Sequence, residues 1–443
     1  MGGISLGYNP PFNLNISNPA SYSSLSLTTF ETAVSFNQFQ LKTAAKTENI
    51  NNSSLSYFAF GFPVKSKKWG TCFGLLPYSN VGYSISDAKT NADGDEELHT
   101  YHGSGGLNQF FVGNGFSPFK NLSIGANASY LFGVINQERT IEYPHLAHYF
   151  NTRVTEATSV GAVFFNFGMQ LTFDSLRIAP SDSIKMLDKK LATIHDSLEV
   201  VRDTMNKATA EQKNEWENTI AKLNAEYIKT DSLKKHVLHR KDKSDWSLTF
   251  GLVASPQTSL SATKSNLTES FVNSQSLGTV VRDTIANISG EKGKLVLPFS
   301  AGFGMMLKKG NKWLIGADFS MQNWKDYTIL GASDSLANSW RISAGAQFTP
   351  NERAMKSYWK TIQYRLGFHY GQTYLQLRNS QLIEYGISAG LGLPIKRSAA
   401  VLHLSAEGGR RGTTSNNLIE ENYLKFSIGF TLNDLWFIKP KFD

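Results

Sequence analysis

The strongest constraint on the fold of this chain is a strict alternation of apolar and small or polar residues. Every second residue from Ile362 to Tyr370 is apolar, and the residues between them are Gln363, Arg365, Gly367 and His369. The same pattern recurs in segments 338–349, 381–394 and 421–432. Because successive side chains of a β-strand point to opposite faces, each segment predicts a strand with one apolar face and one polar face. No run of about 18 or more apolar residues occurs, which excludes a helical membrane protein.

Two kinds of β-protein have such strands. In a soluble sandwich the apolar face lines a core, whereas in an outer-membrane barrel it meets lipid and the polar face lines the lumen. The predicted strands run to roughly 9–11 residues or more, the length that a tilted membrane-spanning strand needs, while soluble strands average about 5–6. The opposite face is rich in Gly, Ser and Gln. The sequence therefore predicts an all-β, transmembrane antiparallel barrel.

We count about fourteen strands, an even number that suits a bacterial barrel formed by a single chain. The predicted parts are an N-terminal hatch or plug (1–28), strands 1–6 (29–174), a periplasmic helical hairpin (175–245), strands 7–14 (246–432) and a periplasmic C-terminal tail (433–443). Short turns would lie at the periplasmic end, and segments 85–104, 136–157, 262–293 and 411–420 would be surface loops. Both termini would then be periplasmic, in the bacterial cell outer membrane. An outer-membrane protein requires a signal peptide and none is visible, so we expect the printed sequence to be the mature part.

Composition excludes several other classes of protein. The chain has one cysteine, Cys72, so it has neither a disulfide framework nor a cysteine zinc site. Its net charge of +8 is spread widely and forms no basic helix, which argues against nucleic acid as a partner. No catalytic motif of the nucleophile-elbow, metalloprotease or phosphate-loop type occurs, and we expect no enzyme, metal or cofactor. Inward-facing Ser343, His369 and Glu384 would be the one conceivable catalytic set.

One segment breaks the strand pattern completely. Between Ser181 and Lys243 the apolar residues are spaced by three and four, as in a coiled-coil seam: Ile184, Leu187, Leu191, Ile194, Leu198, Val201 and Met205. A second helix continues through Trp216, Ile220, Leu223 and Tyr227, so the two helices should close on each other as an antiparallel hairpin. The hairpin is either internally satisfied or a docking arm for a protein partner, with Trp216 and Tyr227 as the docking candidates.

The alternation also assigns charged residues to the lumen, because a charge facing lipid costs about 2–4 kcal/mol at the bilayer midplane for Arg or Lys. Arg341, Arg365 and His369 are candidates for binding a ligand carboxylate. A polar network in the lumen would include Asp318, Glu384, His403 and Glu407. The alternative is that all these groups form ion pairs that fill and rigidify the lumen. Leu76, Leu131 and Phe164 are apolar residues that face inward. They either line an apolar ligand pocket or pack against their neighbours.

Several features resemble the FadL-type family of long-chain fatty acid and hydrophobic-compound transporters of the outer membrane. They are the strand number, an N-terminal segment before the first strand, and Asn18-Pro19-Ala20 within it. The C-terminal stretches Glu407–Thr414, Ile419–Tyr423 and Trp436–Lys439 are similar to the Bacteroidota branch of that family. The resemblance implies a barrel plugged by a hatch that contains Asn18, Pro19 and Ala20. A hydrophobic ligand would enter from outside and leave sideways or past the hatch.

Two functions follow from these patterns. The first is passive uptake of hydrophobic or amphipathic molecules, which the family resemblance implies, with outer-membrane lipid around the barrel. The second is a structural barrel subunit of an outer-membrane protein secretion or assembly complex. That subunit would meet outer-membrane or periplasmic proteins through residues 181–243 or through its loops.

Overall fold

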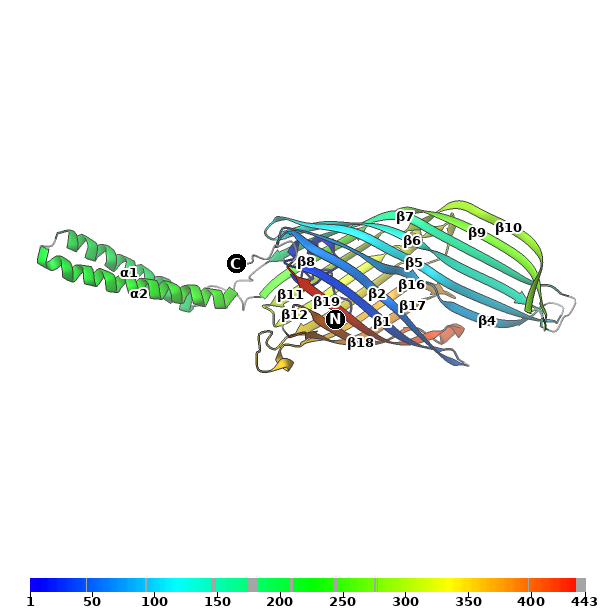
Figure 1. Ribbon diagram of the computed structural model, residues 1–443. Helices are drawn as coiled ribbons and strands as arrows, with labels where there is room; N and C mark the ends of the chain where they lie inside the picture. Colours follow the sequence, from blue (N-terminus) through cyan, green and yellow to red (C-terminus); the bar gives the residue numbers. More distant parts are fainter. Residues whose placement is uncertain are drawn as a thin grey trace. The chain divides into compact units, whose positions relative to one another are not determined.

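The computed structural model describes residues 1–435 except 45, 92–93, 145–148, 174–181, 208–209, 243–245, 275, 277 and 397 (Figure 1). A short 3-10 helix, η1 (Pro19–Ser24), precedes the strands. The first strands are β1 (Thr28–Lys42), β2 (Thr47–Lys65), β3 (Trp69–Asn80), β4 (Tyr83–Thr90), β5 (Glu96–Phe119), β6 (Leu122–Glu142) and β7 (Asn151–Phe173). Two helices follow, α1 (Asp182–Asn206) and α2 (Ala210–Asp242).

The second half of the wall begins after the helices. Its strands are β8 (Trp246–Ser255), β9 (Thr258–Ser274), β10 (Gly278–Leu297), β11 (Ser300–Lys309), β12 (Trp313–Gln322), β13 (Thr328–Ile329), β14 (Ala332–Ser333), β15 (Ser339–Phe348), β16 (Gln363–Leu377), β17 (Ser380–Pro394), β18 (Val401–Gly412) and β19 (Glu420–Asp434). Short 3-10 helices η2 (Trp324–Asp326), η3 (Tyr358–Lys360) and η4 (Ser415–Asn417) lie in the connections.

These elements form a closed antiparallel barrel of fourteen wall strands, which confirms the predicted fold class. Five wall strands are interrupted, so each counts as two elements: β3 with β4, β8 with β9, β10 with β11, β12 with β13, and β14 with β15. For example, β3 and β4 both pair with β5. Pro256 and Pro298 lie at two of the interruptions, where a residue without an N–H cannot continue the ladder. The first strand pairs with β2 on one side and with β19 on the other, and this pairing closes the barrel.

Large apolar side chains cover the outer face of the wall. They include Val34, Phe36, Phe110, Val112, Val163, Phe165, Phe303, Phe319, Ile342, Phe368, Ile387 and Phe426, all of which are exposed. A soluble sandwich would bury these side chains, whereas an outer-membrane barrel presents them to lipid. The protein is therefore an outer-membrane β-barrel. Over the described residues, neither α1 nor α2 is long and apolar enough to cross a membrane.

Most of the surface-loop predictions are wrong. Segments 85–104, 136–157 and 262–293 consist largely of strand, because β4, β5, β6, β7, β9 and β10 continue through them. Figure 1 shows that β5, β6, β7, β9 and β10 extend further than β1 and β2. The apolar alternation stops there, but polar residues form the backbone ladder equally well. The fourth segment, 411–420, does contain a connection, with η4 between β18 and β19.

Glycines on the inner face of the wall form the seat of the hatch. A Cβ added to Gly125 would lie 2.6 Å from the amide nitrogen of Ala20, and one at Gly115 would lie 2.8 Å from that of Ser23. Gly304 and Gly367 approach hatch residues Gly7 and Gly2 in the same way. The small inner residues thus do more than leave room in a crowded lumen, because they let the hatch backbone lie directly on the wall.

The helical insertion has its own small core. The chain divides into two compact units, and the helices belong to the unit made of 172–248 and 307–313. The predicted seam is present: Ile184, Leu187, Leu191, Ile194 and Leu198 are buried. Ion pairs between the helices, Lys190–Glu226 at 2.9 Å and Lys234–Asp188 at 2.5 Å, flank this seam. The antiparallel hairpin was therefore predicted correctly.

We expect Gly125→Val to unseat the hatch, because the new side chain would overlap the backbone at Pro19 and Ala20. Overpacking of this kind costs about 1–3 kcal/mol. Limited proteolysis of the N-terminal segment in the purified protein would measure the change as faster cleavage. Gly82→Ala is the control, since a Cβ at Gly82 meets nothing within 4 Å. Equal cleavage of the two variants would contradict the glycine seat.

Candidate functional site

The hatch is held by side chains of the barrel wall that bind its backbone. Asp318 on β12 accepts hydrogen bonds from the amides of Ser5 (2.6 Å) and Leu6 (2.9 Å) through one carboxylate oxygen. Gln170 on β7 donates to the carbonyls of Leu6 (2.9 Å) and Tyr8 (3.1 Å). Hydrogen bonds to a charged carboxylate are worth about 1.5–3 kcal/mol each, so Asp318 is a strong anchor of the hatch.

The three hatch residues singled out from the sequence organise its turn. Asn18 is fully buried, and its side-chain oxygen accepts from the Ala20 amide at 3.1 Å, which caps η1. Its amide group donates to the Leu6 carbonyl at 2.8 Å. Pro19 takes the first helical position, where a missing N–H is harmless. Burial raises the pKa of the nearby Tyr22 phenol well above its usual value, so this side chain stays neutral.

A second carboxylate, Glu31 on β1, holds the other part of the hatch. One of its oxygens accepts from the Leu14 amide and the Asn13 side chain, both at 3.1 Å, and from the Thr431 hydroxyl at 3.0 Å. The other accepts from the Tyr57 hydroxyl at 3.3 Å. Glu31 is not among the lumen residues that the alternation singles out. The sequence signal that points to it is a single acidic residue among the small inward-facing residues of the first strand.

Two sequence candidates join Glu31 in one polar chain across the wall. His403 on β18 lies 3.1 Å from the Thr431 hydroxyl through Nε2 and 3.0 Å from the Arg365 guanidinium through Nδ1. Arg365 also donates to Gln347 at 2.8 Å and to Gln363. This arrangement occupies the donors of Arg365 with side chains of the wall and connects them to the hatch anchor. The chain of contacts favours a structural role for Arg365 and His403.

The remaining candidates lie on β15–β19. Nε2 of His369 is 3.1 Å from the Tyr423 hydroxyl and 3.7 Å from Glu384, which accepts from Arg411 at 3.3 Å. The Tyr423 hydroxyl also reaches Glu407 at 3.5 Å. Ser343 lies opposite His369 in the register, yet no hydrogen bond joins their side chains in the described part of the chain. The base of a catalytic triad would need that bond to its nucleophile.

A cavity of about 480 Å³ lies between the hatch and the wall. Hatch residues from Ser5 to Ser17 form one side, and the wall contributes Ser56, Tyr57, Leu76, Gln109, Asn127, Phe164, Asn166 and Ser255. Small-molecule sites usually measure about 300–1,000 Å³ and combine apolar walls with a few polar groups. The side-chain oxygens of Asn127 and Asn166 are buried without a hydrogen-bond partner. The cavity therefore combines an apolar surface with polar side chains.

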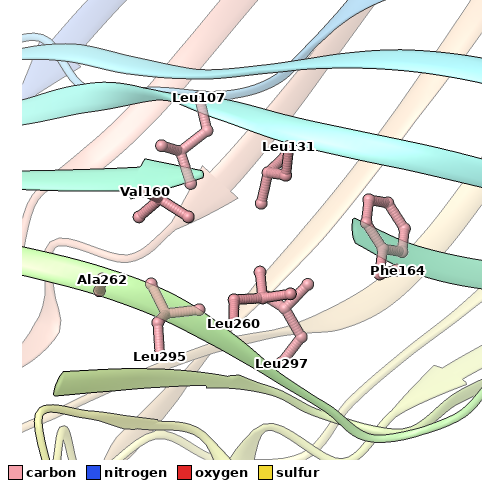
Figure 2. Packing of buried hydrophobic residues seen from close by; sticks show 8 residues of the cluster. All are labelled: Leu107, Leu131, Val160, Phe164, Leu260, Ala262, Leu295 and Leu297. Carbon is pink, nitrogen blue, oxygen red and sulfur yellow. The ribbon is translucent and has the colours of Figure 1, made fainter. Parts of the chain in front are cut away.

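An apolar cluster adjoins this cavity. Figure 2 shows its side chains pointing toward one another from several strands: Leu107, Leu131, Val160, Phe164, Leu260, Ala262, Leu295 and Leu297. Leu131 and Phe164, two of the apolar residues singled out from the sequence, belong to it. Leu76 packs instead against a second cluster that includes Leu14, Tyr22 and Phe111. Phe164 also lines the cavity, so the cluster and the cavity are continuous.

The wall is incompletely paired beside the cavity. The β2–β3 ladder runs from Lys65–Trp69 only as far as Phe58–Leu75. Beyond that point, in the described residues, β2 pairs with β1, and β3 and β4 pair with β5. Pro77, just past the last pair, has no N–H to donate. We call this unpaired stretch between 47–57 and 76–90 the seam; Ser56, Tyr57 and Leu76 of the cavity lie at its start.

Comparison with known proteins gives the family. The model of the family described as BamG matches residues 1–232 and 199–443. The chain belongs to the BamG family. The FadL-type resemblance seen in the sequence holds at the level of the fold. No curated protein matches the chain.

Three solved structures show how far the likeness of fold extends. The "CymD monoaromatic hydrocarbon channel" is 11% identical with a TM-score of 0.52, covering 98% of this chain and 96% of that one. The toluene transporter TbuX of Ralstonia pickettii is 10% identical with a TM-score of 0.51, covering 94% and 92%. A Pseudomonas aeruginosa FadL homologue is 9% identical with a TM-score of 0.53, covering 98% and 96%. The BamG-family chain thus shares the barrel fold of these proteins over nearly its whole length.

We expect Glu31→Gln to loosen the hatch by about 1–3 kcal/mol, because the amide that replaces one oxygen would donate toward groups that are themselves donors. Hydrogen exchange of the Leu14 amide in the purified barrel should become faster. Glu48→Gln is a matched control on an exposed strand residue that pairs only loosely with Lys46, at 3.8 Å. Unchanged exchange at Leu14 would show that Glu31 is not an anchor.

Proposed function

We propose that this BamG-family protein is a passive outer-membrane channel for hydrophobic and amphipathic molecules, such as long-chain fatty acids. The observation that carries the proposal is the continuity of three features: the apolar cluster, the cavity above the hatch, and the seam in the wall. The cluster supplies an apolar surface inside an otherwise polar lumen. The cavity has the size of a small-molecule site, and the seam lies where a molecule could pass between strands into the bilayer.

The route follows from this order of features. A hydrophobic molecule enters at the end opposite the hatch, contacts the cluster, occupies the cavity and leaves sideways through the seam or past the hatch. No energy source is needed, because apolar surface leaving water is stabilised by roughly 25 cal/mol per Å². The printed names of the fold neighbours, which mention monoaromatic hydrocarbons and toluene, agree with this class of cargo.

We place the hatch end and both termini in the periplasm. The first and last wall strands support this placement, because Thr28 pairs with Asp434, so β1 begins and β19 ends at the same rim. We also keep the assignment to a Bacteroidota branch as a prediction from the C-terminal motifs.

We expect Ser56→Trp to slow uptake severalfold, because an indole at this position would fill the cavity at the start of the seam. The measurement is the rate of fluorescence increase of N-phenylnaphthylamine, a neutral apolar dye, in cells whose outer membrane otherwise excludes it. Ser53→Trp is the control, because Ser53 lies on the outer surface of the same strand. Equal rates for wild type and both variants would contradict the route.

A second candidate function is favoured by the helical hairpin. The two matches of the family model together cover the whole chain, the hairpin included. Its helices bury the apolar residues between them and still expose Val200, Tyr227 and Ile228 to solvent. We propose, as the alternative, that the protein is a barrel subunit of an outer-membrane secretion or assembly complex that docks through this hairpin. The partly buried Trp216 would then support the docking surface from within, and exposed Tyr227 would contact the partner.

The docking alternative predicts that a partner depends on residues 181–243. Tagged protein purified from its own membrane in mild detergent should then carry a stoichiometric protein. That protein should be lost when a short Gly-Ser linker replaces the hairpin, and reduced in Tyr227→Ser. Lys229→Ser is the matched control on the same helix. Retention of the same partners without the hairpin would exclude docking through it.

A further inference from the structure

A hollow of about 400 Å³ lies on the barrel wall where β1 contacts β2 and β19. Phe36 and Gln38 of β1, Asn51 of β2 and Phe426 of β19 are among its lining residues. The register places Phe426 opposite Phe36, and Asn51 opposite Gln38. Opposite residues share a face of a sheet, as do residues two apart on one strand, so all four side chains lie on the outer face. We call this hollow the outer amide site.

The outer amide site lies where the apolar belt of the wall ends. Toward the rim of Thr28, the next outward pair of β1 and β2 is apolar, Val34 opposite Leu55. In the other direction the next outward pair is Gln40 opposite Asn49. The outward apolar residues of such a barrel span the hydrocarbon of the bilayer, so the site lies at the level of the lipid headgroups.

The polar groups of this site are not bound to other parts of the protein. The side chains of Gln38 and Asn51 form no hydrogen bond with any residue that the structure describes. Along 47–57, β2 pairs only with β1 in the described residues, so alternate backbone groups of its other edge have no strand to bind. Each carboxamide carries a donor and an acceptor. The site thus presents donors and acceptors together at headgroup level.

The lining of the site is uncharged. This holds for all seven residues that the structure describes around it. Phosphate and carboxylate groups are bound best by Arg or Lys, because a hydrogen bond with an ionised partner is roughly twice as strong as one between neutral groups. A hydroxyl group both donates and accepts, and so does a carboxamide. The chemistry therefore favours a neutral headgroup with several hydroxyl groups, which is the chemistry of a sugar.

Two aromatic rings supply the apolar part of the site. Phe36 and Phe426 are each 48% exposed, and they form the last aromatic pair of the belt on β1 and β19. A free sugar would leave most of this apolar surface in water. A lipid that carries the sugar would cover it with the first part of its acyl chains, and removal of apolar surface from water is stabilising. The aromatic pair therefore favours a glycolipid over a free sugar.

We propose that the outer amide site binds the neutral sugar headgroup of a membrane glycolipid. Gln38 and Asn51 exchange hydrogen bonds with the sugar hydroxyl groups, and Phe36 and Phe426 contact the upper acyl chains. Further hydroxyl groups reach the unpaired edge of β2 and satisfy its backbone groups. The site goes beyond the proposed channel, because it lies on the outer face of the wall and takes no part in the route through the lumen.

The test is equilibrium binding to the delipidated full-length protein, measured by native mass spectrometry in octyl tetraethylene glycol ether, a detergent without sugar. The probes are dioleoyl monogalactosylglycerol, dioleoylglycerol, dioleoylphosphatidylglycerol and free galactose. We expect the galactolipid to bind at least about tenfold more tightly than dioleoylglycerol, which lacks the sugar. Gln38→Leu and Asn51→Leu should each weaken binding of the galactolipid by about two- to tenfold, because each removes hydrogen bonds at nearly constant side-chain volume.

Matched controls come from the next outward pair. Gln40→Leu and Asn49→Leu make the same changes on the same strands and face but outside the hollow, and they should bind the galactolipid like wild type. Equal losses in the control variants, or equal binding of the galactolipid and dioleoylglycerol, overturn the proposal. Equally tight binding of the phosphatidylglycerol overturns the neutral headgroup, and equally tight binding of galactose overturns the lipid source. Unchanged heat-modifiable migration on electrophoresis shows that each variant is folded.

Discussion

The pairing of β1 with β19 closes the barrel and makes every other feature of the fold possible. A bilayer offers no water to satisfy backbone amides and carbonyls, so a sheet can cross it only when its two edges pair with each other. Here the register from Thr28–Asp434 to Lys42–Glu420 provides that closure. Once the sheet is closed, the apolar face of each strand must lie outside and the polar face inside. The lumen, the seat of the hatch and the cavity beside it follow from this assignment.

The place where β2 and β3 separate is also a place where the structure offers a site. The two strands separate after Phe58–Leu75, next to the cavity between the hatch and the wall. An unpaired strand edge is costly within lipid, so this opening needs compensation from polar side chains, from ordered water or from a bound molecule. The proposed channel uses this requirement.

The hatch is held by polar side chains from different parts of the barrel wall. Asp318 and Glu31 hold it from different strands, and the chain of contacts through Thr431 and His403 extends from Glu31 to Arg365. Charges that the alternation assigned to one lumen network thus have three different surroundings. Asp318 anchors the hatch, His403 and Arg365 support Glu31, and Glu384 and Glu407 lie around Tyr423.

The periods of two and of three to four residues depend on local geometry alone, so they predict the number of wall strands, the outward and inward faces, and the helical hairpin. They do not determine which inward residues meet. Shifting a strand by two residues keeps its apolar face outward, so the pattern leaves the register open, and the register decides that Ser343 lies opposite His369. The role of Glu31, the glycine seat and the seam likewise required the tertiary structure, since each depends on contacts between segments far apart in the chain.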